Sequence, residues 1–456
     1  MLNSSFKNIS PIDGRYKKKT IFLKNIFSEY GLLKYRMKIE LKWFKKLSNI
    51  LKINEIPKFS KNSLIFLKNI RKKISNNDIK KIKKLEKKFK HDIKSIEYFI
   101  KKKIKKNKFF YKIKQFVHFS CTSEDINNLA YALMLKKSKK KIFIPYFKKI
   151  ISYIKYLAKL YKNNSLITRT HGQIATPSTM GKEMIIFYYR IKRQLKQFKK
   201  ISILGKFNGS VGNYNAHVFS YPEINWCEVS KDFVTSLGLI WNPCTTQIES
   251  HDYIAELLNC ITRINNILIN FNRDLWGYIS LDYFKQNINI KEIGSSIMPH
   301  KINPINFENS EGNLGISNAL MIHMSNKLPI TRWQRDLSDS TVLRNLGLVF
   351  GYSIIAYDSL LIGLQKIKIN SKKMLLELNN NWQILAEPIQ IFLKKNGMNN
   401  SYEYMKKITK GKIINKNKMF NFINNLKISK KKKKYLKTLQ PKNYIGYAKN
   451  IIKKLM

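Results

Sequence analysis

The chain has 456 residues. A single hydrophobic core usually supports a shorter chain, so we expect two or three domains. Its 44% hydrophobic content excludes a wholly disordered chain, and with no signal-like leader and no run of about 20 apolar residues we expect neither secretion nor a membrane span. The four cysteines lack CxxC spacing, which argues against a zinc site or a disulfide framework and fits a reducing cytoplasm.

The formal net charge of +59 is unevenly distributed. Residues 61–114 hold 21 Lys/Arg against 4 Asp/Glu, whereas residues 294–345 hold 5 against 4. A basic chain with interleaved aromatic residues is one pattern of nucleic-acid binding, and this alternative rests on charge alone. Because the excess lies in lysine-heavy helical stretches, we interpret it as solvated helix faces and do not expect a nucleic-acid partner.

Helical periodicity dominates the sequence. Apolar side chains recur every three or four residues over 147–161, over 184–198 and over 254–275. The last of these stretches makes about six turns at 3.6 residues per turn. Strand-like alternation bounded by turn signals is scarce. The pattern predicts an all-α protein whose centre is a bundle of long helices.

Small and polar residues gather in connectors between the predicted helices. The connectors are SPIDGRY (10–16), CTSEDINN (121–128), RTHGQIATPSTMG (169–181), NGSVGNYNAH (208–217) and GSSIMPHKINP (294–304). Connectors on a rigid scaffold commonly carry function. We place domain boundaries near residues 117 and 362, which gives three helical domains at 1–117, 118–362 and 363–456.

The segment 294–304 is the strongest functional signal. Its glycine allows flexibility, and its hydroxyls, lysine and asparagine bring donors of several kinds together. Backbone N–H groups, an ammonium and an amide in one loop suit an anion such as the dianion that develops when a carboxylate stabilises a carbanion. An ordinary mobile loop is the alternative on these residues alone.

The run GSSIMPHKINP matches every fixed position of the GSSxMPxKxNP signature of the fumarase/aspartase superfamily, whose members break a C–N or C–O bond by anti β-elimination. SPIDGRY, HDIKSIEYF, FSCTSEDINNLAYALML, RTHGQIATPSTMGKEM, GSVGNYNAH and RWQRDLSDSTVLRN resemble the adenylosuccinate lyase family within it, especially its long bacterial form. The resemblance spans nearly the whole chain.

This resemblance implies three all-α domains and a homotetramer in which each active site takes residues from three chains. It implies elimination of fumarate from adenylosuccinate and from succinylaminoimidazole carboxamide ribotide in purine biosynthesis. No cofactor is implied, and the seven histidines show no metal-ligand spacing, so no metal is expected.

The resemblance also assigns the chemical roles. Elimination needs a base for the proton next to a carboxylate and an acid for the departing nitrogen. Ser295 corresponds to the base, and His171, whose imidazole titrates near neutral pH, corresponds to the general acid. A serine acts as a base only if neighbouring donors stabilise its alkoxide. Lys301 and Asn303 correspond to a carboxylate-binding pair.

Further positions match substrate-binding residues of the family. They are Arg15, Tyr16, Lys90, His91, Asp92, Thr122, Ser123, Gln247, Asn309, Arg335, Ser340, Thr341 and Arg344. The planar fork of arginine suits phosphate and carboxylate. Without the resemblance, surface salt bridges with Asp336 or Asp339 would be the preferred interpretation of the last two arginines.

Two positions depart from the family pattern. Lys90 stands where close relatives carry Asn, and Ile174 replaces a proline beside His171. Neither change removes a group that the elimination needs. Another lyase of the superfamily, or a structural protein on the same scaffold, remains an alternative. A structural protein should have lost some catalytic residues, whereas all are present here.

Overall fold

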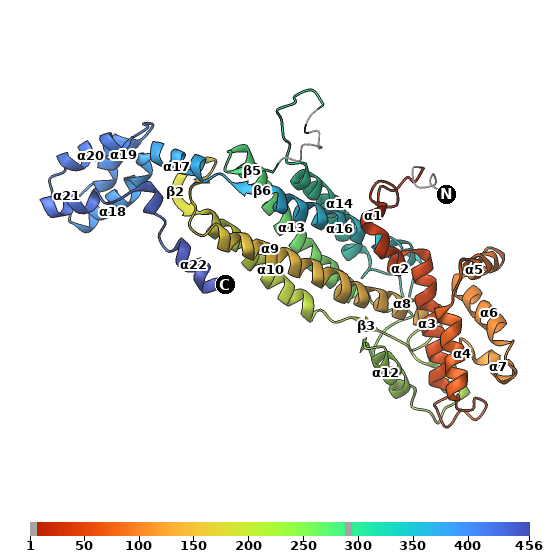
Figure 1. The fold of residues 1–456 in the computed structure, drawn as a ribbon. Helices are drawn as coiled ribbons and strands as arrows, with labels where there is room; N and C mark the ends of the chain where they lie inside the picture. The colour runs from red at the N-terminus through yellow and green to blue at the C-terminus, as the bar shows by residue number, and fades with distance from the viewer. Residues whose placement is uncertain (1–6, 288–293, 295) are drawn as a thin grey trace. The chain divides into compact units, whose positions relative to one another are not determined.

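The computed structural model describes residues 7–287, 294 and 296–456. The chain is 66% helical, and its few strands pair two by two (Figure 1). This architecture confirms the predicted all-α class. All four cysteines carry free thiols.

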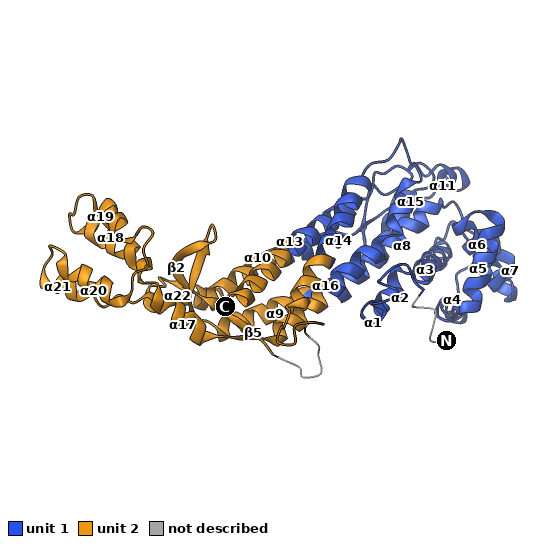
Figure 2. Ribbon diagram, turned by 90° about the horizontal axis from the view of Figure 1, so that it is seen from above, with its two compact units in different colours: residues 1–146, 195–265, 313–355 blue, residues 147–194, 266–312, 356–456 orange. Residues whose placement is uncertain are grey.

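The chain forms two compact units, coloured separately in Figure 2. Unit 1 comprises residues 1–146, 195–265 and 313–355, and unit 2 comprises residues 147–194, 266–312 and 356–456. Five long helices contribute residues to both units: α9 (Ile144–Leu160), α10 (Met180–Lys200), α13 (Asp252–Ser280), α14 (Ile305–Lys327) and α16 (Leu346–Lys366). The division into three domains with boundaries near 117 and 362 stays a prediction.

The remaining elements of unit 1 are mostly helices of the N-terminal third. They are α1 (Lys17–Thr20), α2 (Lys24–Phe27), α3 (Glu29–Leu47), α4 (Lys61–Lys72), α5 (Asn76–Phe89), α6 (Asp92–Ile104), α7 (Lys108–Ile113), α8 (Ser123–Ser138), α11 (Asn215–Ser220), α12 (Trp226–Ser236) and α15 (Ser338–Leu343), with the parallel pair β3 (Leu204–Gly205) and β4 (Ile240–Trp241). Several begin at a side-chain cap. Ser75, for example, forms a capping box with Asp78 at the start of α5.

The remaining elements of unit 2 are two antiparallel strand pairs and the C-terminal helices. They are β1 (Ser165–Thr170) with β2 (Gln173–Thr179), β5 (Phe284–Gln286) with β6 (Ile367–Ile369), and α17 (Ser371–Asn380), α18 (Ala386–Lys395), α19 (Ser401–Thr409), α20 (Lys416–Asn425), α21 (Lys430–Leu436) and α22 (Ala448–Leu455). An apolar core that includes Leu378, Trp382 and Leu393 joins α17, α18 and the segment between them.

The three periodic stretches predicted from the sequence are α9, α10 and α13. Every apolar residue of the stripe over 254–275 is buried, and the stripe over 147–161 is buried except for the half-buried Ile151. Burying a Leu, Ile or Phe side chain contributes about 1.5–3 kcal/mol. Burial along one face is therefore what fixes these helices.

The connector predicted over 169–181 is only partly a loop, because it forms most of the β1–β2 hairpin. Thr170 pairs with Gln173, which leaves His171 and Gly172 as a two-residue turn. Both have positive φ, 52° and 73°, as a type I′ turn requires. The β-branched Ile and Thr residues of both strands favour extended backbone, a preference that the dense Gly and Pro signals of this stretch concealed.

Among the described residues, one stretch, Ser338–Lys366, is long and apolar enough to cross a membrane by length and composition. However, 78% of its most apolar window is buried inside the protein. A buried core helix passes the same test, so the stretch is weak evidence for a membrane span.

Gly181, in the first turn of α10, provides a test of the packing in unit 2. Alanine in a helix usually gains up to about 1 kcal/mol over glycine. A Cβ at Gly181, however, would lie 2.4 Å from the carbonyl oxygen of Ala158 and 2.6 Å from the Cα of Lys162. Relieving an overlap with backbone costs about 1–3 kcal/mol, so we expect Gly181→Ala to lower the free energy of unfolding in urea titrations.

Gly277 in α13 is the matched control, because a Cβ there meets nothing within 4 Å. We expect Gly277→Ala to raise the free energy of unfolding by about 0.5–1 kcal/mol. Equal stabilisation by both substitutions would contradict the close approach of α10 to Ala158.

Candidate functional site

A cavity of about 610 Å³ in unit 1 gathers most of the predicted substrate-binding residues. Its lining comprises Lys83, Glu86, Lys87, Lys90, His91, Asp92, Ser123, Asn127, Arg335, Leu337, Ser340, Thr341 and Arg344. Eight of these thirteen residues were predicted from the sequence. They come from chain segments more than 200 residues apart, so the fold has brought separate motifs to one place.

Helix ends build much of this cavity. His91 caps the N-terminus of α6, where its Nδ1 accepts a hydrogen bond from the N–H of Lys94 at 3.2 Å. A neutral imidazole in this arrangement carries its proton on Nε2, which leaves that nitrogen as a donor. Ser123 is the first residue of α8. The partial positive charge at both N-termini favours an anionic ligand.

Lys90 ends α5 in the left-handed conformation, with a φ of 56°. Asn adopts this conformation more readily than lysine because its short polar side chain can hydrogen-bond locally. The position is therefore defined by backbone geometry, and a lysine there adds a charge at the rim of the cavity without changing the turn.

Asp92, a lining residue of the cavity, forms ion pairs with two arginines. Its carboxylate lies 2.7 Å from Nη2 of the buried Arg36 and 3.5 Å from Nη2 of Arg344. Burial alone would raise the pKa of Asp92, but the charge of Arg36, the N–H of Ile93 and the charge of Arg344 together lower it. The carboxylate therefore stays ionised and holds Arg344 at the cavity wall.

Arg335 pairs with two buried carboxylates, and one of them, Asp339, is a partner that the sequence named for a surface salt bridge. Its Nη2 lies 3.0 Å from Glu124 and 3.8 Å from Asp339, and its Nη1 donates to Gln247 Oε1 at 3.2 Å. Burial raises the pKa of Glu124, and the charge of Arg335 offsets only part of this rise. Nε of Arg335 has no hydrogen-bond partner among the described residues.

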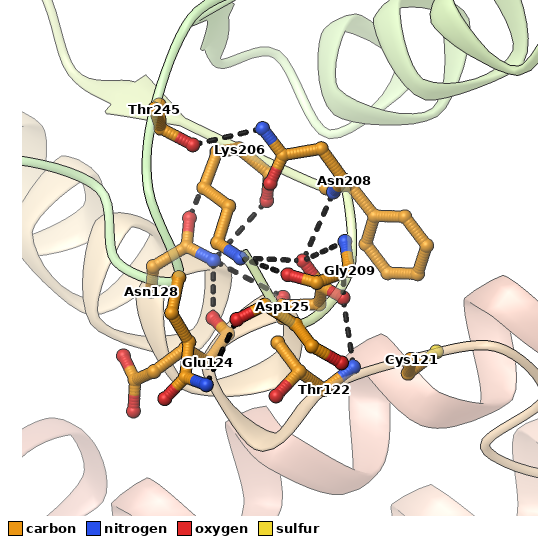
Figure 3. A network of polar contacts seen from close by, with 12 residues as sticks. Cys121, Thr122, Glu124, Asp125, Asn128, Lys206, Asn208, Gly209 and Thr245 are labelled. Atoms are coloured by element: carbon orange, nitrogen blue, oxygen red, sulfur yellow. Dashed lines mark hydrogen bonds and ion pairs between the residues drawn. The ribbon is translucent and has the colours of Figure 1, made fainter. Parts of the chain in front are cut away.

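A buried ion pair and its hydrogen bonds connect the start of α8 with the connector at 208–217, as Figure 3 shows. Lys206 Nζ lies 2.8 Å from Asp125 Oδ1, and both side chains are fully buried. The Asp125 carboxylate also accepts hydrogen bonds from the backbone N–H of Thr122 (2.9 Å), of Asn208 (3.0 Å) and of Gly209 (3.2 Å). One carboxylate thus anchors both the start of α8 and the connector at 208–217.

The connector at 208–217 also holds Gln247 by a hydrogen bond. Gln247 Nε2 donates to the carbonyl of Ser210 at 2.9 Å, while its Oε1 accepts from Arg335. Gly212 allows the close approach, because its φ is +91° and a Cβ there would lie 2.1 Å from the carbonyl oxygen of Thr245. Gln247 is therefore not a lining residue of the cavity, but it is hydrogen-bonded to one, Arg335.

Three other predicted residues of unit 1 are not part of the cavity lining. Arg15 is exposed, and its guanidinium lies 6.0 Å from the ring of Tyr16, which precedes α1. Thr122 precedes Ser123 at the start of α8. Their roles as substrate contacts stay predictions.

The remaining predicted residues belong to unit 2. His171 is exposed at the tip of the β1–β2 hairpin. Asn303 Nδ2 donates to the carbonyl of Gly294 at 3.1 Å, and a Cβ at Gly294 would lie 2.2 Å from the carbonyl oxygen of Lys301. The two ends of the segment 294–304 therefore close on each other. Asn309 in α14 accepts a hydrogen bond from Ser359, and Ser295 lies outside the described residues.

The sequence interpretation missed five lining residues: Lys83, Glu86, Lys87, Asn127 and Leu337. Lys83, Lys87 and Lys90 follow at intervals of four and three residues, a spacing that puts them on one helix face. The ammonium group of Lys83 forms ion pairs with Glu29 and, at 2.8 Å, with Glu86. The spacing could have revealed the group, but lysine is too common in this chain for it to stand out.

Two family models match the chain. The lyase model matches residues 14–317, and the model of the adenylosuccinate lyase C-terminal region matches residues 331–445. An adenylosuccinate lyase of Buchnera aphidicola from Schizaphis graminum is 58% identical over 449 residues, which cover 98% of each chain. The adenylosuccinate lyase of Escherichia coli K12 is 51% identical over 452 residues, which cover 99% of each chain.

Solved structures show the same fold at low identity. A fumarate lyase from Mesorhizobium has a TM-score of 0.76 at 14% identity, with 95% of this chain and 97% of that chain covered. The β-carboxy-cis,cis-muconate cycloisomerase of Acinetobacter calcoaceticus has a TM-score of 0.75 at 15% identity, with the same coverage. At these identities the likeness establishes the fold alone.

The Lys206–Asp125 pair provides the test of the site's framework. Removing one partner of a buried ion pair costs about 3–5 kcal/mol, because the other charge stays buried and uncompensated. We expect Lys206→Met to lower the free energy of unfolding by this amount in urea titrations. The double substitution Lys206→Met with Asp125→Asn removes both charges and should cost less than Lys206→Met alone.

Lys46→Met is the matched control, because Lys46 forms an exposed ion pair with Asp232 at 3.5 Å in the same unit. Exposed pairs contribute about 0–1 kcal/mol. A loss at Lys206 no larger than the loss at Lys46 would show that the buried pair does not organise the loops.

Proposed function

The chain belongs to the adenylosuccinate lyase family, and we propose on that basis that it is a carbon–nitrogen lyase that eliminates fumarate from adenylosuccinate and from succinylaminoimidazole carboxamide ribotide. The first reaction gives AMP and the second gives the free carboxamide ribotide, both in purine biosynthesis. The cavity that gathers eight predicted substrate-binding residues is the observation that supports this activity best.

The charge of the cavity fits such substrates. Each substrate carries a phosphate and two carboxylates, and the lining offers Lys87, Lys90, Arg335 and Arg344 beside two helix N-termini. Nε of Arg335 is buried and lacks a hydrogen-bond partner among the described residues, so the positive charge of this guanidinium is not fully matched by its protein contacts. Guanidinium groups and helix N-termini are the groups that bind phosphate and carboxylate well.

The elimination moves one proton off carbon and one onto nitrogen. Ser295, as alkoxide, takes the proton from the carbon next to a succinyl carboxylate, and the electron pair delocalises into that carboxylate. The C–N bond then breaks with formation of the fumarate double bond, and His171 protonates the departing nitrogen. Lys301 and Asn303 bind the carboxylate on which negative charge develops.

The assembly belongs to the proposal as well. We infer a cytoplasmic homotetramer with active sites shared between subunits. The long helices leave large apolar side chains exposed, namely Tyr189, Trp276, Ile305, Ile316, Ile322 and Ile362. Burying exposed apolar side chains of this size against another chain would favour association through the long helices. His171, exposed at a hairpin tip, suits a residue that acts on substrate bound by another chain.

Fumarate release from adenylosuccinate tests both the activity and the two proton-transfer residues. The wild-type protein should release fumarate, and Ser295→Ala should lower kcat by about 10²–10⁴-fold while substrate still binds. His171→Asn is the sharper variant of the acid. Asn followed by Gly is favoured in a type I′ turn, so it keeps the hairpin while removing the imidazole.

We expect His171→Asn to lower kcat by a similar factor with an unchanged circular dichroism spectrum. A rate within tenfold of the wild type for either variant would refute that residue's assignment. Wild-type protein that releases no fumarate would refute the proposed activity.

Sharing of sites between chains predicts complementation. Inactive Ser295→Ala and His171→Asn subunits, denatured together and refolded, should recover activity, because some sites in a mixed tetramer take an intact serine from one chain and an intact histidine from another. Each variant refolded alone is the control. Mixed tetramers seen by light scattering without recovered fumarate release would mean that each site is built within one chain.

A further inference from the structure

Three polar side chains of unit 2 connect the β1–β2 hairpin to the rest of that unit. Arg169 on β1 donates from Nη1 to the hydroxyl of Tyr283 at 3.1 Å and pairs through Nη2 with Glu377 in α17. The hydroxyl of Tyr283 donates to Glu377 Oε2 at 2.6 Å. Each of the three residues therefore contacts the other two, and we call them the Arg169 clamp.

The clamp is largely shielded from solvent. The side chain of Arg169 is 24% exposed and that of Glu377 is 19% exposed. Burial and the hydrogen bond to Glu377 raise the pKa of Tyr283 to about 12, so its phenol stays protonated and remains a donor. A half-buried ion pair with a neutral donor bridging it is screened less by salt than an exposed pair.

Apolar packing supports the same strand. Ile167 on β1 is 1% exposed and belongs to the core formed with Leu378 and Trp382. Near the start of the strand, Ser165 Oγ donates to the carbonyl of Lys442 at 2.8 Å. The base of the hairpin is thus held by the C-terminal helices, whereas no described residue hydrogen-bonds to the ring of His171 at its tip.

Tyr283 extends the connection to the segment 294–304. It directly precedes β5, and β5 leads along the chain toward that segment. The N–H of Asn370, the residue before α17, donates to the carbonyl of Tyr283 at 2.8 Å. The clamp therefore connects the hairpin that carries His171 to β5, the strand that precedes the segment 294–304 with the proposed catalytic base.

We propose that the Arg169 clamp is a positioning device for His171, a role that rests on the proposed function. A two-stranded hairpin alone is only marginally stable in water, so the direction of its tip depends on what holds its base. A displacement of about 1 Å at a reacting group costs about 100-fold in rate. Arg169 acts through the backbone of the hairpin and contacts no reacting atom.

The proposal predicts a loss of kcat with little change in KM. The cationic cavity residues that would bind substrate belong to unit 1, and the clamp touches none of them. Glu377→Gln and Arg169→Lys should each lower kcat for fumarate release about 10–100-fold while KM stays within about threefold. Tyr283→Phe removes a single hydroxyl, keeps the ring, and should give a smaller loss of kcat.

Arg190→Lys is the matched control. Arg190 is also a half-buried arginine of unit 2, and its Nη1 donates to Asn270 at 2.8 Å between α10 and α13, away from the hairpin. We expect this variant to keep the wild-type kcat. Amide hydrogen exchange followed by mass spectrometry should show faster exchange in peptides covering 165–179 for the clamp variants, and no change there for Arg190→Lys.

The outcomes separate the two proposals. Active wild-type protein whose Glu377→Gln and Tyr283→Phe variants keep their kcat would overturn the clamp alone. A parallel change of kcat and KM with faster exchange throughout unit 2 would overturn positioning in favour of a general contribution to stability. Wild-type protein that releases no fumarate would overturn the proposed function and the catalytic role of the clamp with it.

Discussion

The buried carboxylate of Asp125 is the group on which the cavity of unit 1 depends. A charge without exposure to water is stable only when it is paired and fully hydrogen-bonded. Lys206 supplies the opposite charge, and the backbone N–H groups of Thr122, Asn208 and Gly209 supply the remaining donors. These donors lie in the loop at the start of α8 and in the connector at 208–217, next to predicted substrate-binding residues. The hydrogen bonds that satisfy the carboxylate are therefore the same ones that shape the loops. Gln247 is held by a hydrogen bond to the second loop, and Arg335 is held in turn by its hydrogen bond to Gln247.

The net charge of +59 acts on this site only through its nearest members. Ionic screening limits the reach of exposed charges to about 8 Å at physiological salt, so lysines on distant helices contribute little to the potential in the cavity. Within the lining, the carboxylates of Glu86 and Asp92 are already committed to Lys83, Arg36 and Arg344. Lys87 and Lys90 have no ion-pair partner among the described residues, so their charge remains for a ligand. The cavity can attract a phosphate for local reasons, whatever explains the lysine content elsewhere.

The sequence predicted those parts of the structure that repeat or that carry a dense motif. The spacing of apolar residues predicted the helices α9, α10 and α13. The resemblance of the motifs to a known family predicted eight residues that line one cavity. The β1–β2 hairpin was missed because β-branched residues compete there with Gly and Pro, and pairing between strands is decided by contacts that a single stretch does not reveal. Lys206 and Arg169 were missed for another reason: each is one of 87 Lys/Arg residues, and only the fold distinguishes a fully buried or clamped cation from a solvated one. The role of Ser295, outside the described residues, stays a prediction.

The two groups of predicted residues differ in how the backbone holds them, and this difference corresponds to two kinds of contribution to rate. His91 and Ser123 lie at helix N-termini, where donors are fixed before any ligand arrives. In the proposed role as substrate contacts they would bind the ground state and the transition state alike, and such contacts mainly lower KM. His171 instead occupies a left-handed turn position, with a φ of 52°, that Asn or Gly would adopt at lower cost. Backbone strain of this kind persists where surrounding contacts over-determine it, and the Arg169 clamp and the packing of Ile167 supply such contacts. The proposed proton transfer by His171, and not the stability of the turn, would account for an imidazole in that position. On this proposal, residues that hold the hairpin should govern kcat, whereas the helix ends should govern affinity.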